Sequence, residues 1–252
     1  MVIERQERSL EVNGSAMRVV SVRPRVAGAL PALVYATDIF GLTDSALRSI
    51  DRFAGYGFAV AAFEMYHRFE PAGTALAFEA DRDRALADSK RVGFRDLDAD
   101  VAALVAHLQA DPGIDASRIG AVGFCFGGHV AFRAALLPAV RKSVAFYGTG
   151  IHNGDLGAGG DSRSLARAAE ITGDLLLIFG SRDPHVPPEG RETIARELTA
   201  AGVRFRISLY DAEHAFLRDE GPRYDPELAD RAFAEAIAFF DCARASRVLR
   251  SE

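Results

Sequence analysis

Short apolar segments alternate with amphipathic segments along most of this chain, and this alternation limits the folds open to it. Segments that are apolar at most positions are typical of strands buried on both faces of a sheet. The amphipathic segments carry their apolar residues at helical spacing. This pattern predicts an α/β fold with a mostly parallel central sheet flanked by helices on both faces. The expected strands are 29–36, 58–65, 118–124, 142–148, 174–180 and 204–210, and the expected helices are 45–57, 96–111, 127–137, 188–202 and 226–246.

Three segments depart from this rhythm. Asn13 and Gly14 lie between two strand-like runs and predict a β-hairpin at the start of the chain. Residues 66–95 are long and polar, and residues 149–173 begin as a glycine-rich loop, so both are expected to be binding loops or lids. No internal repeat or linker interrupts the sequence, and residues 1–252 are predicted to form a single domain.

Charge and cysteine content exclude several classes of protein. The net charge of −5 is mild and has no basic stripe, so nucleic-acid binding is not expected. The first ten residues lack the apolar core of a signal peptide, and no apolar run has the length of a membrane span. Cys125 and Cys242 lie in unlike surroundings, so a disulfide framework is improbable and a cytoplasmic location is predicted.

Cys125 lies in a G-x-C-x-G pattern, between an expected strand and the helix that follows it. This context predicts a nucleophile on a sharp strand-to-helix turn, with glycines that allow the two elements to pass closely. The dipole at the helix N-terminus favours a thiolate there. The backbone amide of Phe126 can point at a developing oxyanion. The alternative is a small buried core residue, which would not need a glycine on both sides.

A thiolate nucleophile needs a base, and the base needs a carboxylate that orients it. Asp183 follows one expected strand and His214 follows another, in the chain order nucleophile, acid, base. Loops at the carboxyl ends of parallel strands share one edge of the sheet, so the three residues can converge. Asp211 and Glu213 precede His214 too closely to orient its ring.

The remaining histidines are weaker candidates for the base. A loop position beside the site is expected for His185, possible substrate contact for His67 and His152, and packing or surface positions for His129 and His107. No set of side chains has metal-ligand spacing, and no metal or other cofactor is expected. The glycine-rich segment at 154–160 lacks the Lys-Ser/Thr of a phosphate-binding loop.

These motifs together resemble the dienelactone hydrolase family of the α/β-hydrolases. "GFCFGG" at 123–128 is similar to the nucleophile motif of that family, "SRDPHVP" to its acid loop, "DAEHAF" to its histidine loop, and "FYG" at 146–148 also fits. The resemblance covers most of the chain, from about residue 30 to the last helix. It implies an α/β-hydrolase fold, the triad Cys125, His214 and Asp183, and a substrate-binding position for Tyr147.

Further roles follow from the resemblance alone. Asp38 occupies the place of a family glutamate that contacts the resting cysteine, and the amide of Ile39 is the implied second oxyanion donor. Arg218 and Arg84 match two arginines of the family that bind a substrate carboxylate. Arg82 is the alternative to Arg84 if the alignment shifts by two residues. Asp88 replaces an expected tyrosine, and the 149–173 loop is longer than is usual. Both departures suggest a substrate other than a dienelactone.

The predicted function is hydrolysis of a carboxylic ester or lactone through a thioacyl-enzyme intermediate. The substrate is expected to be a small ester or lactone, neutral or anionic, and the protein a monomer or small homo-oligomer with no membrane partner. A general carboxylesterase or thioesterase with the same triad is the nearer alternative. A non-catalytic ligand-binding relative is the more distant one.

Overall fold

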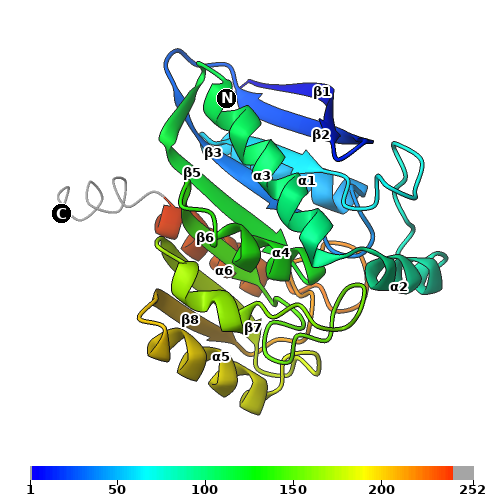
Figure 1. Cartoon of the computed structure of the whole chain (residues 1–252), viewed down its shortest axis with the longest axis vertical. Coiled ribbons are helices and arrows are strands. Elements are labelled where there is room, and N and C mark those ends of the chain that lie inside the picture. Colours follow the sequence, from blue (N-terminus) through cyan, green and yellow to red (C-terminus); the bar gives the residue numbers. More distant parts are fainter. Residues whose placement is uncertain (1, 241–252) are drawn as a thin grey trace.

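One twisted eight-stranded sheet forms the centre of the molecule, in a computed structural model that describes residues 2–240 (Figure 1). The strand order is β1-β2-β4-β3-β5-β6-β7-β8. Strands β3 to β8 pair in parallel, whereas the β1–β2 hairpin joins β4 antiparallel. The mostly parallel sheet is therefore confirmed. The strands are β1 Ile3–Val12, β2 Ser15–Pro24, β3 Leu30–Ala36, β4 Ala59–Phe63, β5 Ile114–Phe124, β6 Val140–Phe146, β7 Asp174–Gly180 and β8 Arg204–Tyr210.

The helices cover both faces of this sheet, as predicted (Figure 1). Helices α3, α4 and α5 pack on one face, and α1 and α6 pack on the other. The helices are α1 Asp44–Gly55, α2 Arg82–Arg91, α3 Phe94–Ala110, α4 Phe126–Ala134, α5 Pro188–Ala200 and α6 Pro226–Phe240, with a short 3₁₀ helix at Leu165–Glu170. None of the helices in residues 2–240 combines the length and the apolar character of a membrane span.

The predicted hairpin turn is present between β1 and β2. Val12 pairs with Ser15 across it, and Asn13 and Gly14 have φ angles of 50° and 79°. Both angles lie in the left-handed region, which Asn and Gly adopt more readily than other residues.

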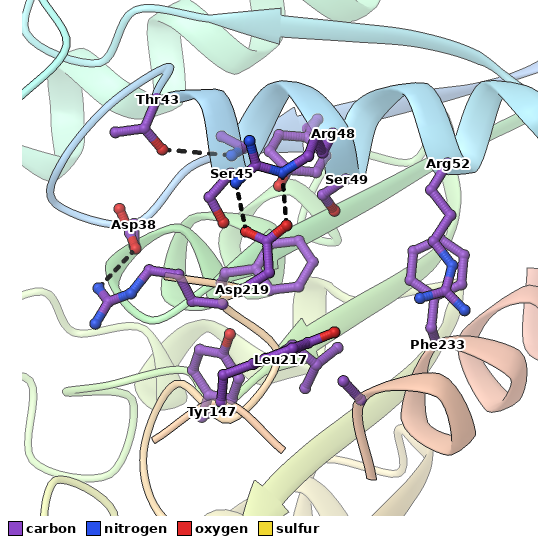
Figure 2. A pocket seen from close by; sticks show the side chains of 16 residues that line it. Asp38, Thr43, Ser45, Arg48, Ser49, Arg52, Tyr147, Leu217, Asp219 and Phe233 are labelled. Atoms are coloured by element: carbon purple, nitrogen blue, oxygen red, sulfur yellow. Dashed lines mark hydrogen bonds and ion pairs between the residues drawn. The ribbon is translucent and has the colours of Figure 1, made fainter. Parts of the chain in front are cut away.

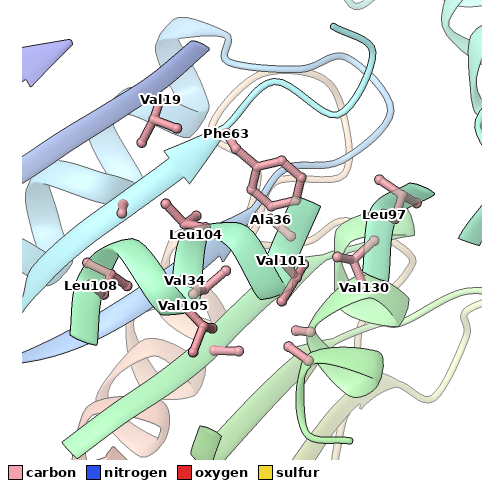
Figure 3. Close-up of a cluster of buried hydrophobic side chains, with 14 of the residues drawn as sticks. Val19, Val34, Ala36, Phe63, Leu97, Val101, Leu104, Val105, Leu108 and Val130 are labelled. Atoms are coloured by element: carbon pink, nitrogen blue, oxygen red, sulfur yellow. The ribbon is translucent and has the colours of Figure 1, made fainter. Parts of the chain in front are cut away.

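The central strands are apolar throughout because successive side chains enter two different cores. In β3, Val34 and Ala36 face α3 and α4, whereas Leu33 and Tyr35 face α1 and α6. Figure 3 shows the first of these cores, where one side of α3 packs against the sheet. The α3 side chains in it are Leu97, Val101, Leu104, Val105 and Leu108.

The two long connections contain more regular structure than the sequence predicted. Helix α2 lies within residues 66–95, and α3 begins at Phe94 rather than at 96. Helix α2 buries only Ala85, Asp88 and Ser89, so it has no apolar stripe for sequence periodicity to reveal. The last helix is described as far as Phe240. Its expected continuation to 246 lies outside the described residues, as does Cys242.

Replacement of Leu104 by alanine tests the packing of α3. The side chain is fully buried, so we expect Leu104→Ala to lower the free energy of unfolding by about 2–5 kcal/mol in urea titrations. Leu209→Ala is the control, because that side chain is 56% exposed on the edge strand β8. Equal losses for the two variants would contradict the assignment of Leu104 to the core.

Candidate active site

Cys125 occupies the turn between β5 and α4, as the sequence predicted. Strand β5 ends at Phe124, α4 begins at Phe126, and Cys125 between them has φ 56° and ψ −117°. Its amide donates a hydrogen bond to the carbonyl of Phe146 on the neighbouring strand, at 3.0 Å. A non-glycine residue with positive φ is strained and persists only where the surrounding structure enforces it. The turn thus fixes the place of the thiol at the carboxyl edge of the sheet.

Two glycines make this turn possible. A Cβ atom on Gly127 would lie 2.1 Å from the carbonyl oxygen of Thr37, at the end of β3. A Cβ atom on Gly123 would lie 1.9 Å from the carbonyl oxygen of Gly127. Both distances are shorter than any real contact of a Cβ atom with backbone. The spacing of the G-x-C-x-G pattern is therefore set by the close approach of α4 to the strands.

His214 and Asp183 meet above the same edge from two different loops. His214 Nδ1 donates to Asp183 Oδ2 at 2.7 Å, and Asp183 Oδ1 accepts the amide of His185 at 2.8 Å. Both the acid and the imidazole are buried. The carboxylate can only accept, so the proton resides on Nδ1 of His214 and the other ring nitrogen is free to face Cys125.

The pKa of His214 reflects this contact with Cys125. Burial opposes the charged ring, but negative charge at Cys125 and hydrogen bonds to Asp183 and Cys125 outweigh it and raise the pKa of His214 to about 9. Beside a Cys125 thiolate, the imidazole therefore carries its second proton at neutral pH. The structure thus places Cys125 and His214 on one cavity and joins His214 to Asp183 by a hydrogen bond.

A cavity of about 140 Å³ opens over Cys125 and His214. Ile39 and Phe126 line it, and their backbone amides have no acceptor among residues 2–240. The rest of the lining contains an apolar wall and three arginines, together with Asp38, Ser89, Thr149 and His185. The wall is Phe40, Phe78, Leu86, Leu156 and Ala215, and the arginines are Arg82, Arg218 and Arg223.

Asp38 is paired with Arg218 in this structure. Arg218 Nη1 donates to Asp38 Oδ2 at 3.4 Å, and the amide of Phe40 donates to Asp38 Oδ1 at 2.9 Å. Burial raises the pKa of Asp38, against the opposing effects of the Phe40 amide and the Arg218 charge. No hydrogen bond joins Asp38 to Cys125 in the described part of the chain. The guanidinium of Arg218 also lies over the ring of Phe78, 3.7 Å from its centroid.

The Asp38–Arg218 pair also borders a second cavity, of about 120 Å³, on the α1 side. Figure 2 shows Asp38, Asp219 and Tyr147 around this second cavity. Tyr147 lines it and is not among the residues that line the catalytic cavity. The ring of Tyr147 lies edge-on to the His214 ring, with centroids 5.0 Å apart. In this structure Tyr147 therefore packs against His214, and its role in substrate binding stays a prediction.

The two arginines suggested by the resemblance have different surroundings. Arg218 lines the catalytic cavity, but Arg84 is half exposed, forms an ion pair with Glu70 and does not line it. Arg82, the alternative in register, does line it. Arg82 and Arg84 are two residues apart on α2, so their side chains leave the helix in directions that differ by more than half a turn. Asp88, further along α2, is buried beside Arg91 and also lies outside the cavity lining.

The other histidines have the following places. His185 lines the cavity, with its ring centroid 4.6 Å from that of His214. His67 is buried against Ser15 and Asp100, which explains its conformation without a substrate. His129 is fully buried within the molecule, while His107 and His152 are partly buried.

Sequence reasoning missed Arg223 and Thr149, which also line the cavity. Arg223 follows a loop with no motif, and Thr149 lies at the start of a glycine-rich segment whose composition carries no functional signal.

Over most of its length the chain is similar to proteins and structures that are already known. Residues 17–243 match the model of the dienelactone hydrolase family. A Saccharomyces cerevisiae protein named "Putative carboxymethylenebutenolidase" is 33% identical over 216 residues, which cover 82% of this chain and 79% of that protein. The carboxymethylenebutenolidase of a Pseudomonas species is 25% identical, over 91% of this chain and 92% of its own. The crystal structure named "Putative Dienelactone Hydrolase" from Klebsiella pneumoniae has a TM-score of 0.84 and 26% identity, and covers 95% of this chain and 99% of its own.

Replacement of Gly127 by alanine tests the close approach beneath the turn. The new Cβ would meet a backbone oxygen that cannot move independently, so we expect Gly127→Ala to destabilise the protein by about 1–3 kcal/mol or more. Thermal unfolding measures the loss. Gly55→Ala is the control, since nothing lies within 4 Å of the Cβ position there. A Gly127→Ala variant as stable as the control would contradict this account of the motif.

Proposed function

Because the chain belongs to the dienelactone hydrolase family and is a hydrolase of carboxylic ester bonds, we propose that it opens small lactones or esters with Cys125, His214 and Asp183. The observation that carries this proposal is that Cys125 and His214 line one cavity, while Asp183 accepts a hydrogen bond from the His214 ring behind it. Cys125 is the nucleophile, His214 is the acid and base, and Asp183 holds the imidazole in one tautomer.

The first half of the reaction forms a thioester. An imidazolium beside Cys125 favours the thiolate, which attacks the carbonyl carbon of the substrate. Negative charge then develops on the carbonyl oxygen, where the free amides of Ile39 and Phe126 can donate to it. One such donor lowers a barrier of this kind by roughly 3–4 kcal/mol. When the tetrahedral intermediate collapses, the carbon–oxygen bond breaks and His214 gives its proton to the leaving oxygen.

The second half of the reaction regenerates the enzyme. His214, now neutral, accepts a proton from water as the oxygen of that water attacks the thioester carbon. The carbon–sulfur bond breaks, the carboxylic acid leaves, and the thiolate and imidazolium are restored. In a lactone the leaving oxygen stays attached to the acyl group, so one hydroxy or oxo acid is released.

The cavity supports an anionic substrate of modest size. Arg82, Arg218 and Arg223 line it, and guanidinium groups bind carboxylates through paired hydrogen bonds. Arg218 is already paired with Asp38, so a substrate carboxylate would have to compete with that side chain.

A general carboxylesterase is the second candidate. The aromatic and aliphatic wall, with Phe40, Phe78 and Leu86, favours it because this wall would accept an uncharged acyl group. A substrate panel separates the two candidates: preference for neutral esters over anionic lactones would favour the esterase.

Removal of the thiol tests the nucleophile. We expect Cys125→Ala to abolish hydrolysis of an activated ester and to lose the acyl adduct that intact-mass spectrometry detects on the native protein. The folded state should persist in circular dichroism, since the substitution removes one atom from a partly exposed side chain. Undiminished hydrolysis by the variant would remove Cys125 from the mechanism.

The pH dependence tests the pairing of His214 with Asp183. Acylation needs the protonated ring, so kcat/KM should fall as the pH rises through about 9, the pKa of His214. The hydrogen bond to Asp183 raises that pKa, so Asp183→Asn should move the alkaline limb to lower pH. Asp211→Asn is the matched control, because that carboxylate is exposed beside Arg182. If the alkaline limb of the pH profile stayed in place in Asp183→Asn, the assignment of Asp183 as the acid would be contradicted.

A further inference from the structure

Thr149, the third residue after β6, contacts both the backbone and the side chain of Cys125. Its amide donates to the Cys125 carbonyl at 3.2 Å, and its hydroxyl oxygen lies 3.9 Å from Cys125 Sγ. The hydroxyl has no other partner among residues 2–240, and Thr149 lines the catalytic cavity. The distance is long for a hydrogen bond, but catalytic hydrogen bonds in unliganded enzymes often tighten only when substrate binds.

A buried histidine fixes the carbonyl of Thr149. His129 Nδ1 donates to the Thr149 carbonyl at 2.9 Å, and His129 Nε2 accepts from Ser164 Oγ at 2.6 Å. The side chain is fully buried, and burial together with the charge of Arg133 lowers the pKa of His129 to about 3. His129 is therefore neutral across the working range of pH, with one tautomer and both ring nitrogens engaged.

The same network fastens the far part of the 149–173 loop to α4. Arg133 Nη1 donates to the Ser162 carbonyl at 2.7 Å and to Ser164 Oγ at 2.8 Å. The rest of its guanidinium binds both carboxylate oxygens of Asp98 on α3. The loop that begins at Thr149 is thus held at both ends against the helix that begins beside the thiol.

Close backbone packing brings Thr149 within reach of Cys125. A Cβ atom on Gly128 would lie 2.7 Å from the Phe146 carbonyl and 2.8 Å from Cα of Gly148. The absence of a side chain at Gly128 therefore lets the residues after β6 lie against the first turn of α4.

We propose that the Thr149 hydroxyl donates a hydrogen bond to the Cys125 thiolate, and that His129 is the positioning residue that holds Thr149 in place. This inference rests on the proposed function, in which Cys125 is the nucleophile. The imidazolium of His214 stabilises the sulfur charge from one side, and the hydroxyl supplies a second donor. Asp38 and Arg218, which line the same cavity, form an ion pair with each other. Thr149 is then a catalytic residue, and the long loop is part of the catalytic machinery.

Replacement of the hydroxyl tests the proposal. Thr149→Val keeps the shape of the side chain and removes the donor, whereas Thr149→Ser keeps the donor. We measure thiolate absorbance and the rate of alkylation by iodoacetamide across pH on the full chain. In Thr149→Val the thiolate should appear at higher pH, with alkylation at low pH slower by roughly tenfold, the effect of one hydrogen bond to a charged group. Thr149→Ser should stay close to the native protein.

The role of His129 is tested by a double-mutant cycle with the same titration. His129→Leu should move the thiol titration when Thr149 is present and should add nothing in the Thr149→Val background. A purely structural role for His129 would give the same shift in both backgrounds, and would overturn its assignment as a positioning residue.

Three outcomes overturn the assignment of Thr149. The first is a Thr149→Val variant whose thiol titrates as in the native protein, and the second is an equal loss of alkylation rate in the Val and Ser variants. If the Val variant does not fold, the third is a Thr149→Ala variant whose thiol titrates as in the native protein. Cys125→Ala, assayed in parallel, separates this failure from that of the proposed function. If Cys125→Ala still hydrolyses esters, the nucleophile is wrong; if it is inactive while Thr149→Val titrates as the native protein, only the hydrogen bond is wrong.

Discussion

The close approach of α4 to the ends of β3 and β5 is the constraint on which the site depends. The backbone of Gly127 lies so near the Thr37 carbonyl that no side chain fits between them. This contact forces the chain through a positive φ at Cys125 and leaves the thiol at the helix N-terminus. The packing of the helix against the sheet, and not a flexible loop, therefore places the proposed nucleophile.

The parallel strands place the other two residues of the proposed triad. Asp183 and His214 follow β7 and β8, which pair in register up to Gly180 and Tyr210, so their loops leave the sheet at the same level. The hydrogen bond between them then needs only a short reach from each side. Cys125 follows β5, which only β6 separates from β7, and its side chain lines the same cavity as His214.

Sequence reasoning succeeded where a residue's role is fixed by its neighbours in the chain. Strands buried on two faces must be apolar throughout, and the strand–turn–helix context marks Cys125, so the sheet, the turn at Cys125 and the meeting of His214 with Asp183 could be predicted. Helix α2 was not predicted because it buries few side chains. The Asp38–Arg218 pair could not be predicted from the sequence, since the two residues are 180 positions apart. The contact of Thr149 with Cys125 likewise depends on tertiary packing, which the composition of a loop does not encode.

The pairing of Asp38 with Arg218 also constrains how this site can diverge. Both side chains are largely withdrawn from water, with exposures of 16% and 12%. Loss of either partner alone leaves the other as an uncompensated charge, which is far more costly than loss of an exposed ion pair. An evolutionary path to a new substrate preference therefore favours coordinated replacement at both positions over stepwise change, although they belong to opposite ends of the chain.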